Sequence, residues 1–224
     1  MTIKNKQMYD DFQMVFNNLE SNAAPGLTIF EISMYLTKAY FTFVTSLYNE
    51  YEKNELSRKA LIELVTDLHI NPTSGFNNQK ICDNSVFFKL PDDVLYVVYE
   101  AIKYKHNTED KCLSDKTTPV IPVTHDEFHN IYNNPFRFNN KNAIRLDLNI
   151  NNDRYAEIVA KDSHINYYHL RYVRKPKPII LEDLTGDDRI EGLQVETECE
   201  LNTMYYKEIV NIAAKMAYSD YKNA

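Results

Sequence analysis

The sequence predicts an α+β fold with an N-terminal helical unit, a central antiparallel β-sheet and a C-terminal amphipathic helix. Apolar residues recur at helical spacing through the first third of the chain, strand-like alternation dominates the middle, and a last helical pattern covers 203–221. We expect 1–70 to be the helical part and 71–224 the β-rich part with the C-terminal helix. Together they should form one compact unit, with 71–85 and 105–118 as exposed loops.

Three amphipathic helices are predicted before residue 70. The first carries Met8, Phe12 and Leu19 on one stripe. The second begins at Thr28, where Thr-Ile-Phe-Glu is a capping-box pattern that lets the glutamate side chain bond back to the Thr28 amide. The third covers 56–68. Successive amphipathic helices with short connections favour a packed helical unit.

The second half of the chain is rich in predicted strands. The stretch 94–102 is dominated by Val and Tyr, which favours a strand, with a helix as the alternative. Prolines at 119 and 122 bias the residues before them toward extended backbone. Asn151-Asn152-Asp153 is turn material, so the strands around it should form an antiparallel meander. The predicted strands are 86–88, 94–102, 119–123, 143–150, 155–160 and 165–173.

Composition restricts the function classes. The chain has 224 residues and a formal net charge of −7, whereas dedicated nucleic-acid binders are usually basic. Four glycines cannot build the glycine-rich loops that cradle phosphates. Three cysteines without a CxxC pair indicate reduced thiols and a protein made in a cytoplasm. No apolar run approaches the ~18 residues of a membrane helix. The 17 tyrosines suit half-buried interface surface.

The stretch His125-Asp-Glu-Phe-His129 resembles a metal site. Two histidines four apart on a helix can share one zinc ion, as in His-Glu-x-x-His. Here the glutamate is one position late, which turns it about 100 degrees around the helix. Thr124 to Glu127 also reads as a second capping box, opening a short helix that ends near 133–135. We therefore expect a capped surface helix, and keep a metal hydrolase using His125 and His129 as a third hypothesis. We expect no catalytic residues, metal or cofactor.

Two neighbouring segments of opposite charge form the candidate interface. Four cations occur within residues 171–177, and residues 182–200 contain eight acids against one base, Arg189. These charges can pair or be solvated within one chain, or they can complement each other head to tail between identical subunits, where charge sets register. The basic stretch also leaves open a nucleic-acid-contacting protein. The candidate subunit or partner interface residues are Arg171, Arg174, Lys175, Lys177, Glu182, Asp183, Asp187 and Asp188.

Several separated segments, in order along the chain, match one family pattern. They are Ala23-Ala24-Pro25-Gly26, the stretches 31–33 and 36–39, Pro122 to Phe128 (PVTHDEF), Asn133 to Arg137 (NNPFR), Arg171-Tyr172, Lys175 to Leu181 (KPKPIIL), Thr197 to Leu201 (TECEL) and the last helix. With these segments the chain resembles the ring proteins of the head-to-tail connector, or neck, of crAss-like bacteriophages.

The resemblance implies a structural virion protein, not an enzyme. Such a protein would form a homo-oligomeric ring of twelve copies that docks to the portal or to other neck and tail rings. It would be assembled in the host cytoplasm and located in the virion, without contact to a membrane. DNA would pass through the channel without specific binding. Because every neutralised phosphate adds affinity, we expect acids to outnumber bases on a lumen-facing surface.

Overall fold

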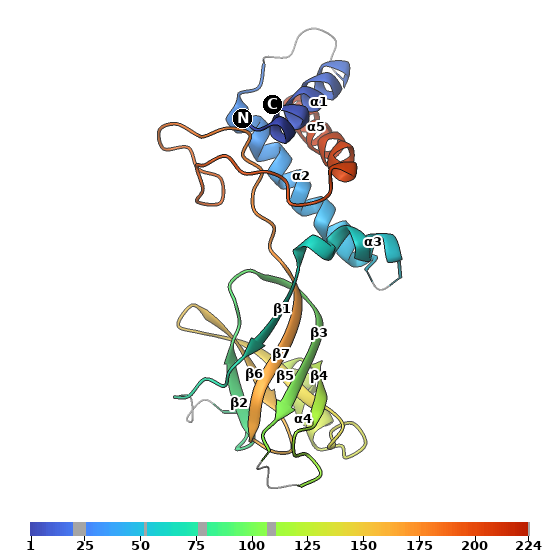
Figure 1. The fold of residues 1–224 in the computed structure, drawn as a ribbon, viewed down its shortest axis with the longest axis vertical. Coiled ribbons are helices and arrows are strands. Elements are labelled where there is room, and N and C mark those ends of the chain that lie inside the picture. Colours follow the sequence, from blue (N-terminus) through green and yellow to red (C-terminus); the bar gives the residue numbers. More distant parts are fainter. Residues whose placement is uncertain (20–25, 52, 76–79, 107–110, 224) are drawn as a thin grey trace. The chain divides into compact units, whose positions relative to one another are not determined.

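The computed structural model describes residues 1–19, 26–51, 53–75, 80–106 and 111–223. Figure 1 shows helices in one part of the chain and a curled sheet in another, so the predicted α+β class is confirmed. The chain forms two compact units, not the single unit expected. Met1–Leu64 and the chain from Pro176 onward form the helical unit, and Val65–Lys175 forms the β unit. The C-terminal helix therefore belongs with the N-terminal helices, which differs from the expected division at residue 70.

The helical unit is built on three long amphipathic helices, and α5 lies beside α1 and α2 (Figure 1). Their apolar stripes meet in a core that contains Phe12, Leu36, Tyr40 and Ile209. The capping box at Thr28 is confirmed, because the Thr28 amide donates to Glu31 Oε2 over 2.7 Å and the Glu31 amide donates to Thr28 Oγ1. The elements are α1 (Ile3–Leu19), α2 (Ile29–Asn49), α3 (Glu55–Leu61), η1 (Ile62–Leu64), η3 (Thr203–Tyr205) and α5 (Tyr206–Asn223).

An extended segment, residues 178–181, is bound to the face of α2 by buried side chains. Thr37 Oγ1 accepts a hydrogen bond from the Ile179 amide over 3.0 Å and donates one to the Ile179 carbonyl over 3.1 Å. One turn earlier, Ser33 Oγ accepts from the Leu181 amide. Ile179 and Leu181 are themselves fully buried. Two hydroxyls on one helix face thus replace the ladder partners that a buried extended backbone requires.

A buried asparagine on α1 completes this anchor. Asn5 Nδ2 donates to the Ile180 carbonyl over 3.0 Å and lies 2.9 Å from Glu196 Oε1. Ile180 also forms an isolated antiparallel bridge with Thr197. The residues at the two ends of the stretch 180–197, Ile180 and Thr197, are therefore bound to each other beside Asn5 of α1.

The β unit contains one seven-stranded sheet of order β1-β7-β3-β4-β5-β6-β2. β4 and β5 run parallel and the other neighbours run antiparallel, so the sheet is mixed and not purely antiparallel. The hairpin of β5 and β6 is confirmed, whereas the predicted meander is wrong, since β7 lies between β1 and β3. The strands are β1 (Val65–Ile70), β2 (Ser85–Lys89), β3 (Val94–Tyr104), β4 (Thr117–Pro122), β5 (Ala143–Ile150), β6 (Asp153–Val159) and β7 (Ile165–Arg174).

The sheet curls around its own core (Figure 1). Beyond β1, Thr73 bridges Phe87 of the opposite edge strand β2, and the Thr73 amide lies 2.8 Å from the Phe87 carbonyl. Side chains of six strands meet inside the curl, among them Phe88, Ile102 and Tyr168. The helix α4 (His125–Tyr132) covers part of the opposite face, where Phe128 packs with residues of β5 and β6.

Several local predictions are corrected. The predicted third helix ends at Leu61, and residues 65–68 belong to strand β1. β-Branched Val65 and Thr66 suit a strand, and all six residues of β1 pair with β7. Residues 94–102 are strand, so the helix alternative is wrong. Thr124 makes no side-chain cap, so the second capping box does not form.

The two expected loops are shorter than predicted. β2 already begins at Ser85 and β4 at Thr117. Leu113 and Thr118 are buried, and Leu113 packs in the core inside the curled sheet. The stretches 76–79 and 107–110 lie outside the described residues.

A buried ion pair lies within the curled sheet. Arg145 Nη1 is 2.9 Å from Glu100 Oε2, and the Tyr168 hydroxyl donates to the same oxygen over 2.6 Å. Arg145 Nε is 3.0 Å from Asp147 Oδ1. Burial raises the pKa of Glu100, and the guanidinium of Arg145 opposes that shift. These groups link β3, β5 and β7 across the inside of the sheet.

Replacing Thr37 by Val should destabilise the helical unit by about 1–3 kcal/mol, because both backbone groups of Ile179 would lose their buried partner. Urea unfolding of the full chain measures this change. Thr42→Val is the matched control, since the Thr42 hydroxyl is exposed and bonds only back to the Lys38 carbonyl of its own helix. Equal effects of the two substitutions would contradict the anchoring role.

Arg145→Met should destabilise the β unit by about 3–5 kcal/mol, because it leaves the Glu100 carboxylate buried without its cation. Adding Glu100→Gln should recover much of that loss. The control is Lys89→Met, which removes the exposed ion pair with Asp153 and should change the unfolding midpoint little, because solvent screens that pair. A double variant no more stable than Arg145→Met would show that the unpaired carboxylate is not the cause.

Candidate functional site

The structure divides the basic stretch between the two units. Arg171 and Arg174 lie on β7 and Lys175 ends the β unit, whereas Lys177 belongs to the helical unit. Arg171 Nη2 donates to Asp67 Oδ2 on the neighbouring strand over 2.8 Å. That hydrogen bond holds the pKa of Asp67 below its ordinary value. The four cations therefore do not form one surface of a single unit.

The acids of residues 182–200 also fall into two groups. Some pair with groups of their own unit, and others are exposed to solvent. Glu196 pairs with the N-terminal amine over 3.2 Å, and Glu198 pairs with Lys4 over 3.0 Å. Glu200 accepts a hydrogen bond from the Lys177 amide. These three acids fasten the segment to its own unit. Asp187 and Asp188, in contrast, are exposed.

Residues 182–195 form a projecting hairpin, which we call the acidic arm. Figure 1 shows it as an orange loop that leaves the helices of its own unit. The Leu184 amide donates to the Gln194 carbonyl over 2.8 Å. At the tip, Ile190 and Leu193 bond to each other in both directions across Glu191 and Gly192. Both central residues have positive φ, 50° and 80°, which is the two-residue hairpin turn that favours glycine.

The base of the arm explains its definite path. Asp183 Oδ1 accepts from the Glu196 amide over 2.7 Å, and Gln194 Nε2 donates to the Gly186 and Asp188 carbonyls. Of the candidate interface residues, Asp183 therefore has an internal structural contact. The carboxylates of Asp187 and Asp188 are exposed.

Sequence reasoning missed a histidine and tyrosine cluster on the sheet surface. His69 and His169 are register partners on β1 and β7, with ring centroids 4.8 Å apart. Tyr167 stacks on His69 at 4.4 Å, and Tyr99 of β3 meets His169 edge-on. His169 also contacts Asp67. Only the pairing of β7 with β1 and with β3 brings these residues together, so no local spacing could indicate the cluster.

The predicted metal helix does form, but its histidines are exposed. His125 Nε2 lies 3.2 Å from the Asp147 carbonyl, and His129 stacks edge-on against Phe128. Within the described part of the chain, no group of three or more His, Cys, Asp or Glu side chains is placed to hold a metal ion. The geometry gives the hydrolase hypothesis no support.

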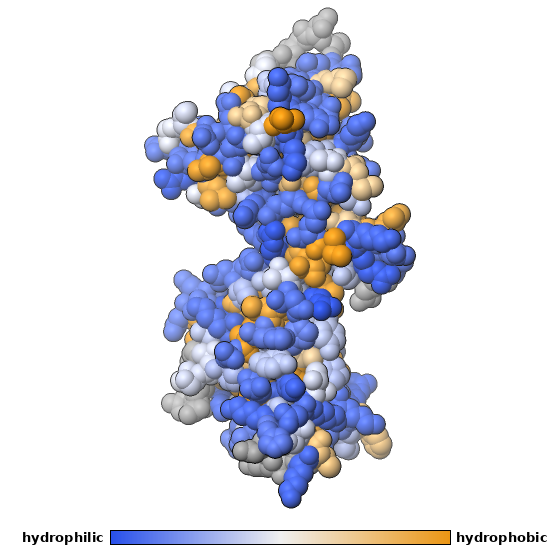
Figure 2. Space-filling view, viewed as in Figure 1, coloured by the Kyte–Doolittle hydropathy of each residue, from blue (hydrophilic) through white to orange (hydrophobic). Residues whose placement is uncertain are grey.

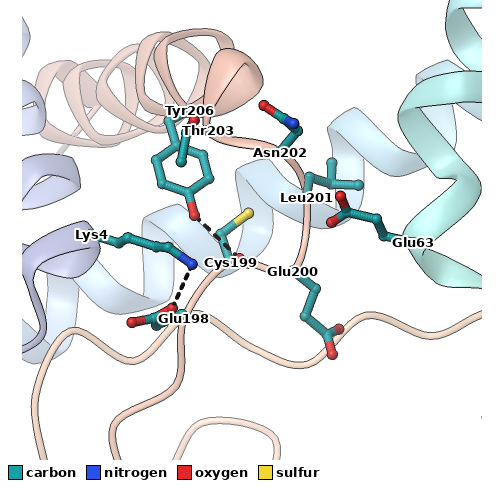
Figure 3. A pocket seen from close by; sticks show the side chains of 9 residues that line it. All are labelled: Lys4, Glu63, Glu198, Cys199, Glu200, Leu201, Asn202, Thr203 and Tyr206. Atoms are coloured by element: carbon teal, nitrogen blue, oxygen red, sulfur yellow. Dashed lines mark hydrogen bonds and ion pairs between the residues drawn. The ribbon is translucent and has the colours of Figure 1, made fainter.

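A polar pocket of about 440 Å³ lies in the helical unit (Figure 3). Lys4 enters it from α1, Glu63 from η1 and Tyr206 from α5, while Glu198 and Cys199 come from the segment before η3. Burial raises the pKa of the Cys199 thiol to about 12, and burial likewise raises that of Tyr206 to about 12. A protonated thiol is a poor nucleophile.

Because a subunit contact would lie on the outside of the protein, the hydropathy of the surface is relevant to it. Figure 2 shows a mainly hydrophilic face with hydrophobic side chains in separate areas. None of the described helices is both long and apolar enough to span a bilayer.

Comparison with known proteins identifies the family. The family model described as "Phage tail ring protein 3/4" matches residues 1–224. The chain belongs to this ring protein family of crAss-like phages. It is a structural ring protein of a phage particle, as the sequence resemblance implied.

Two relatives come from Bacteroides phage crAss001. The chain is 30% identical to "Ring protein 3" over 223 residues, which cover 95% of this chain and 94% of the relative. It is 29% identical to "Ring protein 4/5" over 231 residues, which cover 95% of this chain and 91% of the relative. Both matches extend across the helical and the β unit.

For a ring protein, the functional sites are surfaces that meet other subunits. Protein interfaces favour aromatic side chains and arginine at their core, with charged residues at the rim. In the described part of this ring protein, the acidic arm and the aromatic cluster of the β unit combine such groups.

Proposed function

We propose that this ring protein forms one ring of the head-to-tail connector, or neck, and docks to the portal or to adjacent tail rings around the DNA channel. The observation that supports this proposal most is the match to two ring proteins over at least 91% of their lengths. Such coverage includes both units, so the whole chain, and not one domain of it, resembles a ring subunit.

The two relatives also bear on ring position. This chain is 30% identical to one of them and 29% identical to the other, and the two carry different ring numbers in one phage. We propose that one subunit architecture serves in successive rings, and that surface residues, not the fold, determine where each ring docks. A ring of twelve copies remains our expectation for this chain.

The exposed charges are proposed as the contacts between subunits or rings. Lys175, Asp187 and Asp188 are exposed, and Arg174, the last residue of β7, is half-buried. Opposite charges on different units of one chain can align neighbouring copies head to tail. Such charge pairs set register and association rate more than affinity.

A net charge of −7 suits passage of DNA through the channel. Cations that neutralise phosphates would hold the genome with salt-dependent affinity. We therefore propose a lumen where acids outnumber bases. The alternative, a nucleic-acid-contacting protein using 171–177, has less support, because Arg171 is engaged by Asp67 and the cations belong to two units.

Purified virions should contain this chain at a fixed copy number, visible as a closed ring between head and tail in cryo-electron microscopy. The same map should show an acidic lumen. Absence of the chain from virions would overturn the proposal, and a basic lumen would overturn its electrostatic part. DNA binding by the purified chain with a steep salt dependence would favour the alternative.

Reversing Arg174 and Lys175 to Glu should weaken ring assembly while leaving the monomer folded. The matched control is the same reversal at Arg58 and Lys59, an adjacent Arg-Lys pair on α3, which changes net charge equally. Assembly is measured by mass photometry or by incorporation into virions. If both variants assemble like the wild type, the basic stretch has no role in the contact.

A further inference from the structure

The loop that follows α4 presents an almost fully exposed phenylalanine. Phe136 is 92% exposed, whereas Phe138, two positions later, is buried. Phe138 packs against Tyr132 at 5.1 Å between ring centroids, and Lys161 Nζ lies 4.4 Å from the centre of the Phe138 ring. One aromatic side chain thus anchors the loop to the sheet, and the other points into solvent.

Asparagine side chains hold this loop, residues 133–142, in one conformation. Asn134 Oδ1 accepts from the Phe136 amide over 3.0 Å, and the Asn134 carbonyl accepts from the Phe138 amide over 2.9 Å. Asn142 Oδ1 accepts from the Asn139 amide, while Asn142 Nδ2 donates to the Arg137 carbonyl. The exposed ring therefore sits on a pre-organised loop, which lowers the entropy cost of using it in a contact.

The stretch of chain around Phe136 is basic. Residues 128–146 contain no acid, and Arg137 and Lys141 lie within the loop. Lys116 also reaches it, with Nζ donating to the Asn140 carbonyl over 3.1 Å. An exposed aromatic side chain beside an arginine is the composition found at the core of protein interfaces.

The acidic arm has the complementary composition. It contains five acids and one base, and Val195 and Leu193 on it are 68% and 41% exposed. The loop thus combines an apolar group with positive charge, and the arm combines apolar groups with negative charge. Each copy has one arm, on the helical unit, and one Phe136 loop, on the β unit.

From this complementarity we infer that the Phe136 loop of one copy docks against the acidic arm of a second copy. The inference rests on the ring assembly proposed above and identifies the two surfaces that join neighbours. Because the two surfaces differ, every copy can use both, and the contact repeats in one direction until the ring closes. Phe136 would cover Val195 and Leu193, while Arg137 and Lys141 would face Asp187 and Asp188. In that arrangement the basic stretch at Arg174 and Lys175 is left for a second contact, to another ring.

Substitution of Phe136 tests the contact. Phe136→Ser should weaken association between copies about 30-fold or more, the factor that corresponds to a hot-spot loss of about 2 kcal/mol. The melting temperature should stay unchanged, because the side chain touches solvent. Ile121→Ser is the control, since it removes an exposed apolar side chain elsewhere on the β unit. Equal association of Phe136→Ser and wild type would overturn the inference.

Cross-linking identifies the occupant. In a Cys112→Ser background, Phe136→Cys and Val195→Cys are combined in the full chain, and assembled rings or virions are oxidised and separated on a denaturing gel. A ladder of covalent multimers, absent from either single-cysteine variant, is the expected result. A cross-linked monomer of changed mobility would overturn the inference, because the arm would then meet the loop of its own copy.

Two further outcomes separate this inference from the proposed function. Intact rings without any cross-link would overturn the arm-to-loop contact and leave ring formation standing. Intact rings of Phe136→Ser that no longer attach to the portal or to the next ring would assign Phe136 to another component, and so overturn the second copy as occupant. Wild-type chain that forms no ring in virions would overturn both.

Discussion

The helical unit depends on an extended segment that packs on α2 and, apart from one bridge between Ile180 and Thr197, belongs to no β-ladder. Residues 178–181 are buried, so their amides and carbonyls need partners inside the protein. Thr37, Ser33 and Asn5 supply them from two helices more than 140 positions earlier in the sequence. Because these bonds determine where the chain passes, they also position the base of the acidic arm and, further along the chain, α5.

The same contacts also fix part of the acidic segment, residues 182–200, to the helical unit. Glu196 forms an ion pair with the N-terminal amine, and Glu198 forms one with Lys4 of α1. Between these bound residues and Leu181 the chain must leave the core and return, and the turn at Glu191 and Gly192 makes that return short. The eight acids of this segment therefore lie in two different structures. Some bind the segment to its own unit, and the others lie on the acidic arm.

Local patterns predicted the elements well and their partners poorly. The stripes of α2 and α5 and the alternation of β5 are visible within about ten residues, and all three elements form as expected. β1 was missed because Leu64 and Leu68 continue a helical spacing, and only pairing with β7 reveals a strand. The unit boundary, the parallel pair β4 and β5 and the cluster at His69 and His169 depend on long-range contacts, which no local period records. The resemblance predicted the family, but not which charges are engaged within the chain.

Residues that break the usual rule of burial fall into two groups here. Thr37, Asn5, Glu100 and Arg145 are polar and buried, and each has partners within its own unit, so folding alone explains them. Phe136 is apolar and exposed on a loop that its own hydrogen bonds hold in place, and folding of its unit does not require that ring in solvent. Exposed apolar side chains are common on protein surfaces, so the fixed loop and the neighbouring cations are what set this one apart. A directional contact with the oppositely charged arm supplies an explanation, because a subunit with two unlike and complementary surfaces satisfies both only by joining further copies.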